Sequence, residues 1–469
     1  MDSARCERRA KHMKRTTTIL ATMTAMGMLL AGSSAMAATY EGYTEEEFAA
    51  LEQTTVVKSE DSPTGYYVTF RYKDPDASRV RIYGEWRFSD IESASYFTSQ
   101  NAAPEEWQDG YTVWKTDNWP TAEMEKDEET GVWSYTIPLP TGTWAYRYYV
   151  DGAAGAELTD YTDAKMVADP ANVNYLAEDE DLENLGGEQA LTAVYVPYDE
   201  EKQAATIRHD EEAPRDGENG TVLFETATTE SGIHTSYGIY LPNGFDAARE
   251  EAYPILVLFH GGGGYDGSWM TNGLVNILDN MIAEGRMEPT IVVTPNGSDF
   301  PSDAGFRWNR PEILAFITDT VLPHMTADYN ASADPARRAF AGLSMGGATT
   351  GYAMFHNTDD FDTFILFSPP FTGDVEPDYE NPALKEKNIF FGYGDYDFVA
   401  TRSLYKQAMD ADGNPVQLYD NKNEGACWEY MYGLNEAGVS YRSMNYPYGH
   451  DWVLWRKLIV DVFDNILWK

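Results

Sequence analysis

The pattern of hydrophobic and polar positions divides the chain into two parts with different periodicities. From about residue 55 to 176, short segments alternate or are rich in aromatic residues, and turn-forming Asp, Pro and Gly residues separate them. Several short strands at this spacing predict an all-β sandwich over 55–176. The clearest predicted strands are Tyr66–Tyr72, Arg79–Gly84, Trp133–Leu139 and Trp144–Val150.

From residue 193 to the end, short apolar runs alternate with stretches whose apolar residues recur at helical spacing. This alternation predicts a mainly parallel sheet with helices on both faces, over 193–469. An acidic, glycine-containing stretch over 177–192 is typical of a linker between the two parts. The predicted strands are Ile255–Phe259, Ile291–Thr294, Arg338–Ala341, Phe364–Phe367, Ile389–Phe391 and Tyr441–Tyr446. The predicted helices are Leu274–Glu284, Pro311–Tyr329, Thr349–His356 and Val453–Leu467.

Residues 1–37 have the pattern of a secretory signal peptide. A basic segment precedes the apolar run Ile19–Leu30, and Ala35-Met36-Ala37 then offers a small-x-small cleavage site. The run is shorter than the ~20 residues that span a bilayer, so we expect cleavage after Ala37 rather than anchoring. Loss of Cys6 with the signal leaves Cys427 without a partner for an internal disulfide. A secreted protein without disulfides suggests a bacterial origin.

Composition limits the kinds of partner. The chain has 34 basic and 76 acidic residues, a formal charge of -42, which disfavours binding to nucleic acid or to an anionic membrane. Hydrophobic residues make up 43% of the chain, enough for packed cores. No cluster of His, Cys and carboxylate residues has the spacing of metal ligands, so we expect neither a catalytic metal nor a cofactor.

The motif Gly342-Leu343-Ser344-Met345-Gly346 follows a predicted strand and precedes a predicted helix. This is the strand-turn-helix context of a nucleophile elbow, in which a serine sits on a sharp turn with its hydroxyl exposed. Residues without a Cβ atom on either side let the backbone fold back closely. We therefore predict that Ser344 is a catalytic nucleophile.

A nucleophilic serine needs a histidine base, and the base needs an orienting carboxylate. In α/β-hydrolases the chain order is Ser, acid, His, and His450 is the one histidine beyond His356. It follows the last predicted strand, so we predict that it is the base. The acid is expected after the strand Ile389–Phe391, where Asp397 is our first choice and Asp395 the alternative.

An oxyanion hole requires two backbone N–H groups aimed at the developing negative charge. Met345, which follows the nucleophile, is expected to supply one. The other is expected from the glycine-rich loop after the strand Ile255–Phe259, with Gly262 as the first choice and Gly261 as the alternative. His260 is expected to orient this loop rather than to titrate in catalysis.

Several segments together resemble a known family. The chain over about 195–469 resembles the secreted esterases of carbohydrate esterase family 1, an esterase D-type α/β-hydrolase group that includes feruloyl and acetylxylan esterases. The segment Gly142–Gly152 resembles the early-set immunoglobulin-like module that precedes some secreted esterases. That module is either a carbohydrate-binding domain or a structural spacer. The motifs that carry the esterase resemblance are His260-Gly261-Gly262-Gly263-Gly264, Val292-Val293-Thr294-Pro295-Asn296-Gly297, Ala341–Gly347 and Gly449-His450-Asp451-Trp452.

The resemblance implies a secreted serine esterase that acts on plant cell-wall polysaccharide or its oligosaccharides. Feruloyl esters on xylan are the first expectation, and acetylxylan is an alternative. A siderophore esterase of the enterochelin type and a non-catalytic glycan-binding protein are further alternatives. Aromatic residues near the motifs, namely Phe306, Trp308 and Trp452, are candidates to line the substrate site.

Overall fold

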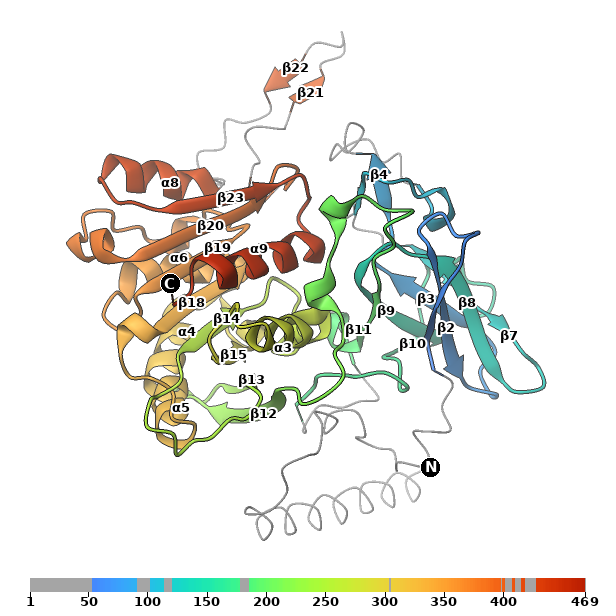
Figure 1. Ribbon diagram of the computed structural model, residues 1–469, viewed down its shortest axis with the longest axis horizontal. Coiled ribbons are helices and arrows are strands. Elements are labelled where there is room, and N and C mark those ends of the chain that lie inside the picture. Colours follow the sequence, from blue (N-terminus) through green and yellow to red (C-terminus); the bar gives the residue numbers. More distant parts are fainter. Residues whose placement is uncertain are drawn as a thin grey trace.

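A computed structural model describes residues 53–90, 102–113, 120–177, 185–302, 305–397, 399–400, 407–409, 415–417 and 427–468. The predicted signal peptide and residues 178–184 of the predicted linker lie outside the described residues. Figure 1 shows a β-rich part, coloured blue to teal, beside a part in which helices flank one large sheet, coloured green to red. The two periodicities of the sequence thus correspond to two different kinds of architecture.

The β-rich part contains two antiparallel sheets that enclose one aromatic core. One sheet has the strand order β1-β2-β8-β7 and the other β10-β9-β3-β6, and Phe70, Trp86 and Tyr146 are buried between them. The four strands predicted here are confirmed, whereas the immunoglobulin-like identity of the module stays a prediction. The strands are β1 (Thr55–Lys58), β2 (Tyr66–Lys73), β3 (Val80–Gly84), β4 (Phe88–Asp90), β5 (Tyr111–Val113), β6 (Thr121–Glu123), β7 (Glu125–Lys126), β8 (Val132–Pro138), β9 (Gly142–Asp151) and β10 (Ala164–Val167).

The second part is built on an eight-stranded sheet with the order β12-β13-β15-β14-β18-β19-β20-β23. Strand β13 is antiparallel to both of its neighbours, β12 and β15. The strands β15, β14, β18, β19, β20 and β23 run parallel to one another. The mainly parallel sheet of an α/β-hydrolase-like fold is therefore present. The strands that follow β10 are β11 (Thr192–Val196), β12 (Thr221–Thr228), β13 (His234–Leu241), β14 (Ile255–Phe259), β15 (Ile291–Pro295), β16 (Pro301–Ser302), β17 (Gly305–Trp308), β18 (Arg338–Leu343), β19 (Thr363–Phe367), β20 (Asn388–Gly394), β21 (Gln407–Met409), β22 (Pro415–Gln417) and β23 (Arg442–Tyr446).

Both faces of this sheet are buried. Along β14, Val257 and Phe259 pack into one core and Leu256 and Leu258 into the other, as the two-residue period of a strand requires. Helices α3 and α9 cover the second core, and α4, α5, α6 and α8 cover the first. The helices are α3 (Val275–Ala283), α4 (Arg310–Phe316), α5 (Leu322–Asp328), α6 (Met345–His356), α8 (Cys427–Glu436) and α9 (Trp452–Asn465).

Some elements differ from the sequence predictions. The helix predicted over Pro311–Tyr329 is two helices joined by a π-helical turn at Ile317–Val321. Helix α6 begins at Met345, four residues before the predicted start, because Gly346 and Gly347 belong to the helix itself. The hairpin of β12 and β13 was not predicted, since the threonine-rich β12 is an edge strand that lies half exposed.

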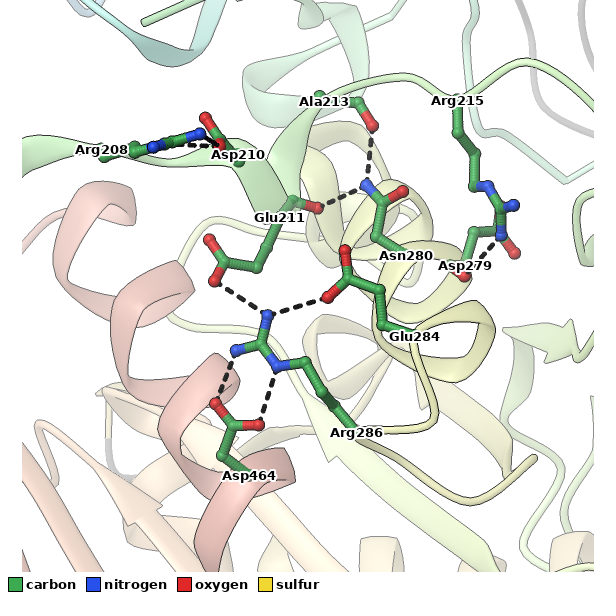
Figure 2. A network of polar contacts seen from close by, with 10 residues as sticks. All are labelled: Arg208, Asp210, Glu211, Ala213, Arg215, Asp279, Asn280, Glu284, Arg286 and Asp464. Atoms are coloured by element: carbon green, nitrogen blue, oxygen red, sulfur yellow. Dashed lines mark hydrogen bonds and ion pairs between the residues drawn. The ribbon is translucent and has the colours of Figure 1, made fainter. Parts of the chain in front are cut away.

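The two parts are tied together through β11 and α9. Strand β11 pairs with β9 of the β-rich part, and buried Arg456 of α9 donates to the carbonyl of Thr143 at 2.9 Å. The Arg456 Nε atom also lies 2.9 Å from the buried Glu212 carboxylate, which accepts the Thr143 N–H at 2.8 Å. Figure 2 shows Arg286 bridging Glu211, in the segment between β11 and β12, to Asp464 of α9. Helix α9, which follows His450, is therefore held from both parts.

Candidate active site

Ser344 lies on a strained turn between β18 and α6. Its φ of 52° and ψ of -115° are unusual for a residue with a side chain, and its N–H donates to the carbonyl of Phe367 at 2.9 Å. A Cβ atom on Gly342 would lie 2.4 Å from the carbonyl carbon of Gly346, and one on Gly346 would lie 2.4 Å from the carbonyl oxygen of His260. The two motif glycines therefore allow the turn to close, and the partly exposed Ser344 remains accessible.

His450 and Asp397 form a buried pair at the same edge of the sheet. The Nδ1 atom of His450 lies 2.9 and 3.0 Å from the two carboxylate oxygens of Asp397, and both side chains are almost fully buried. Because β18, β20 and β23 run parallel, the residues that follow them, including Ser344, gather at their common carboxyl edge. By contrast, Asp395 accepts a hydrogen bond from Asn445 at 2.6 Å. The structure thus pairs Asp397, and not Asp395, with the histidine.

The surroundings keep Asp397 ionised. Burial by itself raises the pKa of this carboxyl group, but the nearby His450 and several hydrogen bonds outweigh burial and lower the pKa below its ordinary value. The donors include Ser368 and the N–H groups of Val399 and Ala400, the latter two at 2.9 and 3.1 Å. An ionised Asp397 favours the His450 tautomer with its proton on Nδ1, which leaves Nε2 to accept a proton.

Sequence reasoning missed Ser368 and the support it receives. This buried serine directly follows β19, and its hydroxyl accepts a hydrogen bond from the Trp455 indole N–H at 3.0 Å. The Trp455 ring also packs edge-on against His450, with 4.9 Å between the ring centres. A polar residue directly after an apolar strand, at the edge where the motif residues gather, was the available sequence signal.

Asp451 fixes the direction in which the chain leaves His450. Its carboxylate accepts the Leu454 N–H at 3.0 Å and caps α9. Burial raises the pKa of this carboxyl to about 6, although the Leu454 hydrogen bond and the charge of Arg456 both act to lower it. The cap thus fixes the chain directly after His450, which lies two residues before the start of α9.

The glycine-rich loop after β14 packs against the elbow. A Cβ atom on Gly261 would lie 3.3 Å from the Cβ atom of Ser344, so this backbone passes directly beside the serine. The next residue, Gly262, is exposed. The first N–H groups of a helix have no intrahelical acceptor, and Met345 is the first residue of α6. The predicted donors Gly262 (or Gly261) and Met345 therefore belong to the two segments that meet at Ser344.

His260 orients this loop through both ring nitrogens. Its Nδ1 atom lies 2.6 Å from the Gly261 carbonyl oxygen, and its Nε2 accepts the Gly297 N–H at 3.0 Å. This arrangement requires a neutral ring with its proton on Nδ1. Burial lowers the pKa of His260 to about 4, although the hydrogen bonds to Gly261 and Asn296 act to raise it. His260 is thus neutral near pH 7.

Two of the aromatic residues that we expected to line the substrate site are largely buried. Trp308 and Trp452 are only 6% and 4% exposed. The Trp308 ring packs against His260, with 5.0 Å between ring centres, and Trp452 packs edge-on against Trp269 at 5.1 Å. Both indoles therefore support the loop and α9 from within the core. The side chain of Phe306 lies outside the described residues.

Two absences hold for the residues that the structure describes. Within them, no group of three or more His, Cys, Asp or Glu side chains is arranged to hold a metal ion. No helix in the same part of the chain is both long and apolar enough to cross a membrane. Cys427 is a buried free thiol in α8.

Comparisons with known proteins identify relatives among xylan-degrading enzymes. The chain is 27% identical over 315 residues to the "Endo-1,4-beta-xylanase/feruloyl esterase" of Xylanibacter ruminicola, covering 65% of this chain and 39% of that protein. It is 34% identical over 161 residues to "Endo-1,4-beta-xylanase Y" of Acetivibrio thermocellus, covering 33% of this chain and 14% of that protein. The chain therefore spans well under half the length of these curated relatives.

Solved structures give more distant likenesses. A ferulic acid esterase from Anaeromyces mucronatus is 16% identical, with a TM-score of 0.43 and coverage of 55% of this chain and 94% of that one. The enterobactin esterase of Shigella flexneri is 16% identical, with a TM-score of 0.44 and coverage of 91% and 98%. The family model described as "Putative esterase" matches residues 229–465, just over half of the chain. The protein therefore belongs to this esterase family.

Proposed function

We propose that the protein is a secreted serine esterase that removes feruloyl groups from plant cell-wall polysaccharide. The observation that carries the proposal is the buried His450–Asp397 pair, which lies at the sheet edge where Ser344 occupies its strained turn. Serine, histidine and aspartate in these roles are the machinery of acyl transfer. The match to the esterase family supports ester hydrolysis as the reaction class.

The proposed reaction has two halves. The Ser344 hydroxyl oxygen attacks the ester carbonyl carbon while His450 accepts the hydroxyl proton, and the N–H groups of Gly262 and Met345 stabilise the oxyanion. The carbon–oxygen bond to the sugar then breaks, and His450 gives the proton to the leaving alcohol. Water, deprotonated by His450, attacks the acyl-enzyme next and releases the acid and Ser344. Ionised Asp397 stabilises the imidazolium that forms in each half.

The choice of substrate rests on the relatives and on charge. The name of the Xylanibacter ruminicola relative joins xylanase and feruloyl esterase activities, and this relative aligns with 65% of the chain. A formal charge of -42 suits a neutral polysaccharide ester better than an anionic iron chelate, which would be repelled. Feruloyl esters on xylan are therefore the proposed substrate, and we propose that the enzyme cleaves them outside the cell. Acetylxylan is the alternative within the same class.

The test compares kcat/KM for methyl ferulate and for an acetylated xylo-oligosaccharide, with Ser344→Ala as the blank. Strong turnover of methyl ferulate that disappears in the Ser344→Ala variant supports the proposal. Turnover of the acetylated sugar alone would replace feruloyl by acetyl as the acyl group. Equal activity of the wild type and the Ser344→Ala variant would refute the mechanism, whichever substrate is cleaved.

A further inference from the structure

The C-terminal end of the predicted linker touches the glycine-rich loop. Glu188 lies in a 3-10 turn at Gly187–Ala190, and its carboxylate accepts a hydrogen bond from the Ser268 hydroxyl at 2.6 Å. Ser268 is fully buried, and its Oγ atom also accepts the Tyr265 N–H at 2.9 Å. Glu188 therefore holds a residue that itself closes the turn after Gly264.

The same carboxylate lies against the loop backbone. A Cβ atom on Gly264 would lie 2.7 Å from the Nδ1 atom of His260, 2.9 Å from the Ser268 Oγ atom and 3.0 Å from the Glu188 Oε2 atom. On the other side, the Ser298 hydroxyl donates to the Gly264 carbonyl at 2.8 Å. The Gly264 backbone is thus held between His260, Ser268 and Ser298 of the hydrolase part and the Glu188 carboxylate, which lies outside that part. We call these four side chains the clamp.

The β-rich part contacts the clamp beside Glu188. Arg147 of β9 donates a hydrogen bond from Nη1 to the carbonyl of Gly187, the residue before Glu188. The guanidinium is itself fixed over the ring of Tyr83, 4.5 Å from the ring centre, and 5.4 Å from that of Tyr149. A Cβ atom on Gly187 would lie 3.5 Å from the Gly263 carbonyl oxygen, so this backbone crosses directly over the loop.

We propose that Glu188 is a positioning residue for the oxyanion hole and that the β-rich part, through Arg147, holds Glu188 in place. The inference rests on the proposed function, since it assigns the loop its role as donor. The loop is exposed at Gly262, and glycines restrict the backbone least, so its geometry depends on side chains that reach it from elsewhere. The β-rich part then serves catalysis by fixing the loop.

Loss of the clamp should affect the chemical step more than substrate binding. Removing an oxyanion donor outright lowers kcat by about 10²–10³, and a displaced donor should lose part of that. For Glu188→Ala we expect kcat on a soluble aryl ester to fall about 10- to 100-fold with KM changed less than about threefold. Glu188→Gln keeps an acceptor for the Ser268 hydroxyl and should retain most of the activity.

The experiment measures kcat and KM for p-nitrophenyl acetate in the full chain and its variants, with Glu200→Ala as the matched control. Glu200 is an exposed carboxylate that follows β11. A second readout is the Ki of an aryl trifluoromethyl ketone, whose adduct needs the oxyanion hole. We expect Ki to rise in Glu188→Ala by the same factor by which kcat/KM falls. The Arg147→Met variant should also lower kcat/KM and raise Ki, each by a smaller factor than Glu188→Ala.

The outcomes separate the two proposals. If the wild type is inactive on the aryl ester, the proposed function fails. If the wild type is active and Glu188→Ala equals Glu200→Ala in kcat and Ki, the positioning role is overturned. A folded Glu188→Gln variant as impaired as Glu188→Ala would also overturn it, because the hydrogen bond to Ser268 would not be what matters. Should Glu188→Ala fail to fold, Glu188→Asp, whose carboxylate is one methylene shorter, replaces it with the same expected loss.

Discussion

Replacing Asp397 by asparagine removes one charge at the centre of the proposed site and keeps the shape of the side chain. In the structure this carboxylate accepts the His450 Nδ1–H at 2.9 and 3.0 Å and the N–H groups of Val399 and Ala400. An asparagine oxygen can still accept the two backbone N–H groups. Its NH₂ group then faces His450 and favours the wrong histidine tautomer.

The size of the effect follows from this geometry. Two opposite charges about 4 Å apart interact by about 4 kcal/mol at an effective dielectric constant of 20. The imidazolium forms only as Ser344 loses its proton, so this stabilisation belongs to the transition state. A loss of about 4 kcal/mol corresponds to about a thousandfold in kcat, since each 1.36 kcal/mol is tenfold. The wrong tautomer adds to this loss, which gives an expected range of about 10³–10⁴.

The matched control is Asp395→Asn, in the same loop and with the same change of charge. Asp395 binds Asn445 at the surface, so we expect less than a twofold change in kcat. The assay is steady-state hydrolysis of methyl ferulate at pH 7.5, with thermal unfolding to show that each variant folds. An Asp397→Asn variant within tenfold of the wild type, or equal losses in both variants, would refute the assignment of Asp397 as the orienting acid.

Three further predictions concern stability. Gly346→Ala places a Cβ atom 2.4 Å from the carbonyl oxygen of His260, so we expect a loss of about 1–3 kcal/mol in urea unfolding; an unchanged midpoint would contradict this. Because the pKa of His260 is lowered from 6.5 to about 4, its contribution is complete above pH 6.5 and is lost as the pH falls toward 4, by about 3 kcal/mol. His260→Gln should therefore flatten the dependence of unfolding free energy on pH in that window, and an unaltered slope would exclude this explanation. Arg456→Met leaves the buried Glu212 carboxylate without its cation and should lose about 3–5 kcal/mol, and adding Glu212→Gln should restore part of that loss; equal stability of the single and double variants would count against the pairing.

The sequence predicts best the elements that are buried on both sides. Strand β14 has its predicted ends, Ile255 and Phe259, because each of its five residues is apolar and buried. The edge strand β12 carries no such continuous signal, since a half-exposed strand tolerates polar residues on its solvent face. The motif around Ser344 was readable because a sharp turn restricts which residues can flank it.

Sequence patterns could not show in which direction a side chain points or which distant residues it contacts. Asp395 and Asp397 lie two residues apart in one loop, and only the folded backbone shows which of them faces His450. The tryptophans near the motifs were candidates to line the substrate site, yet Trp308 and Trp452 are almost fully buried. Glu188 stands in an acidic stretch that is typical of a linker, so nothing local distinguishes it from its neighbours.

The pairing of β11 with β9 has a consequence for how this protein can be recombined. The chain passes the acidic stretch and enters β11, Thr192–Val196, which completes the sheet of the β-rich part before the hydrolase sheet begins at β12. A gene fusion or protease cut placed at residue 190 would strip one fragment of an edge strand and leave the other with that strand unpaired. Shuffling of either part between related enzymes should therefore succeed only when the crossover lies between Val196 and Thr221.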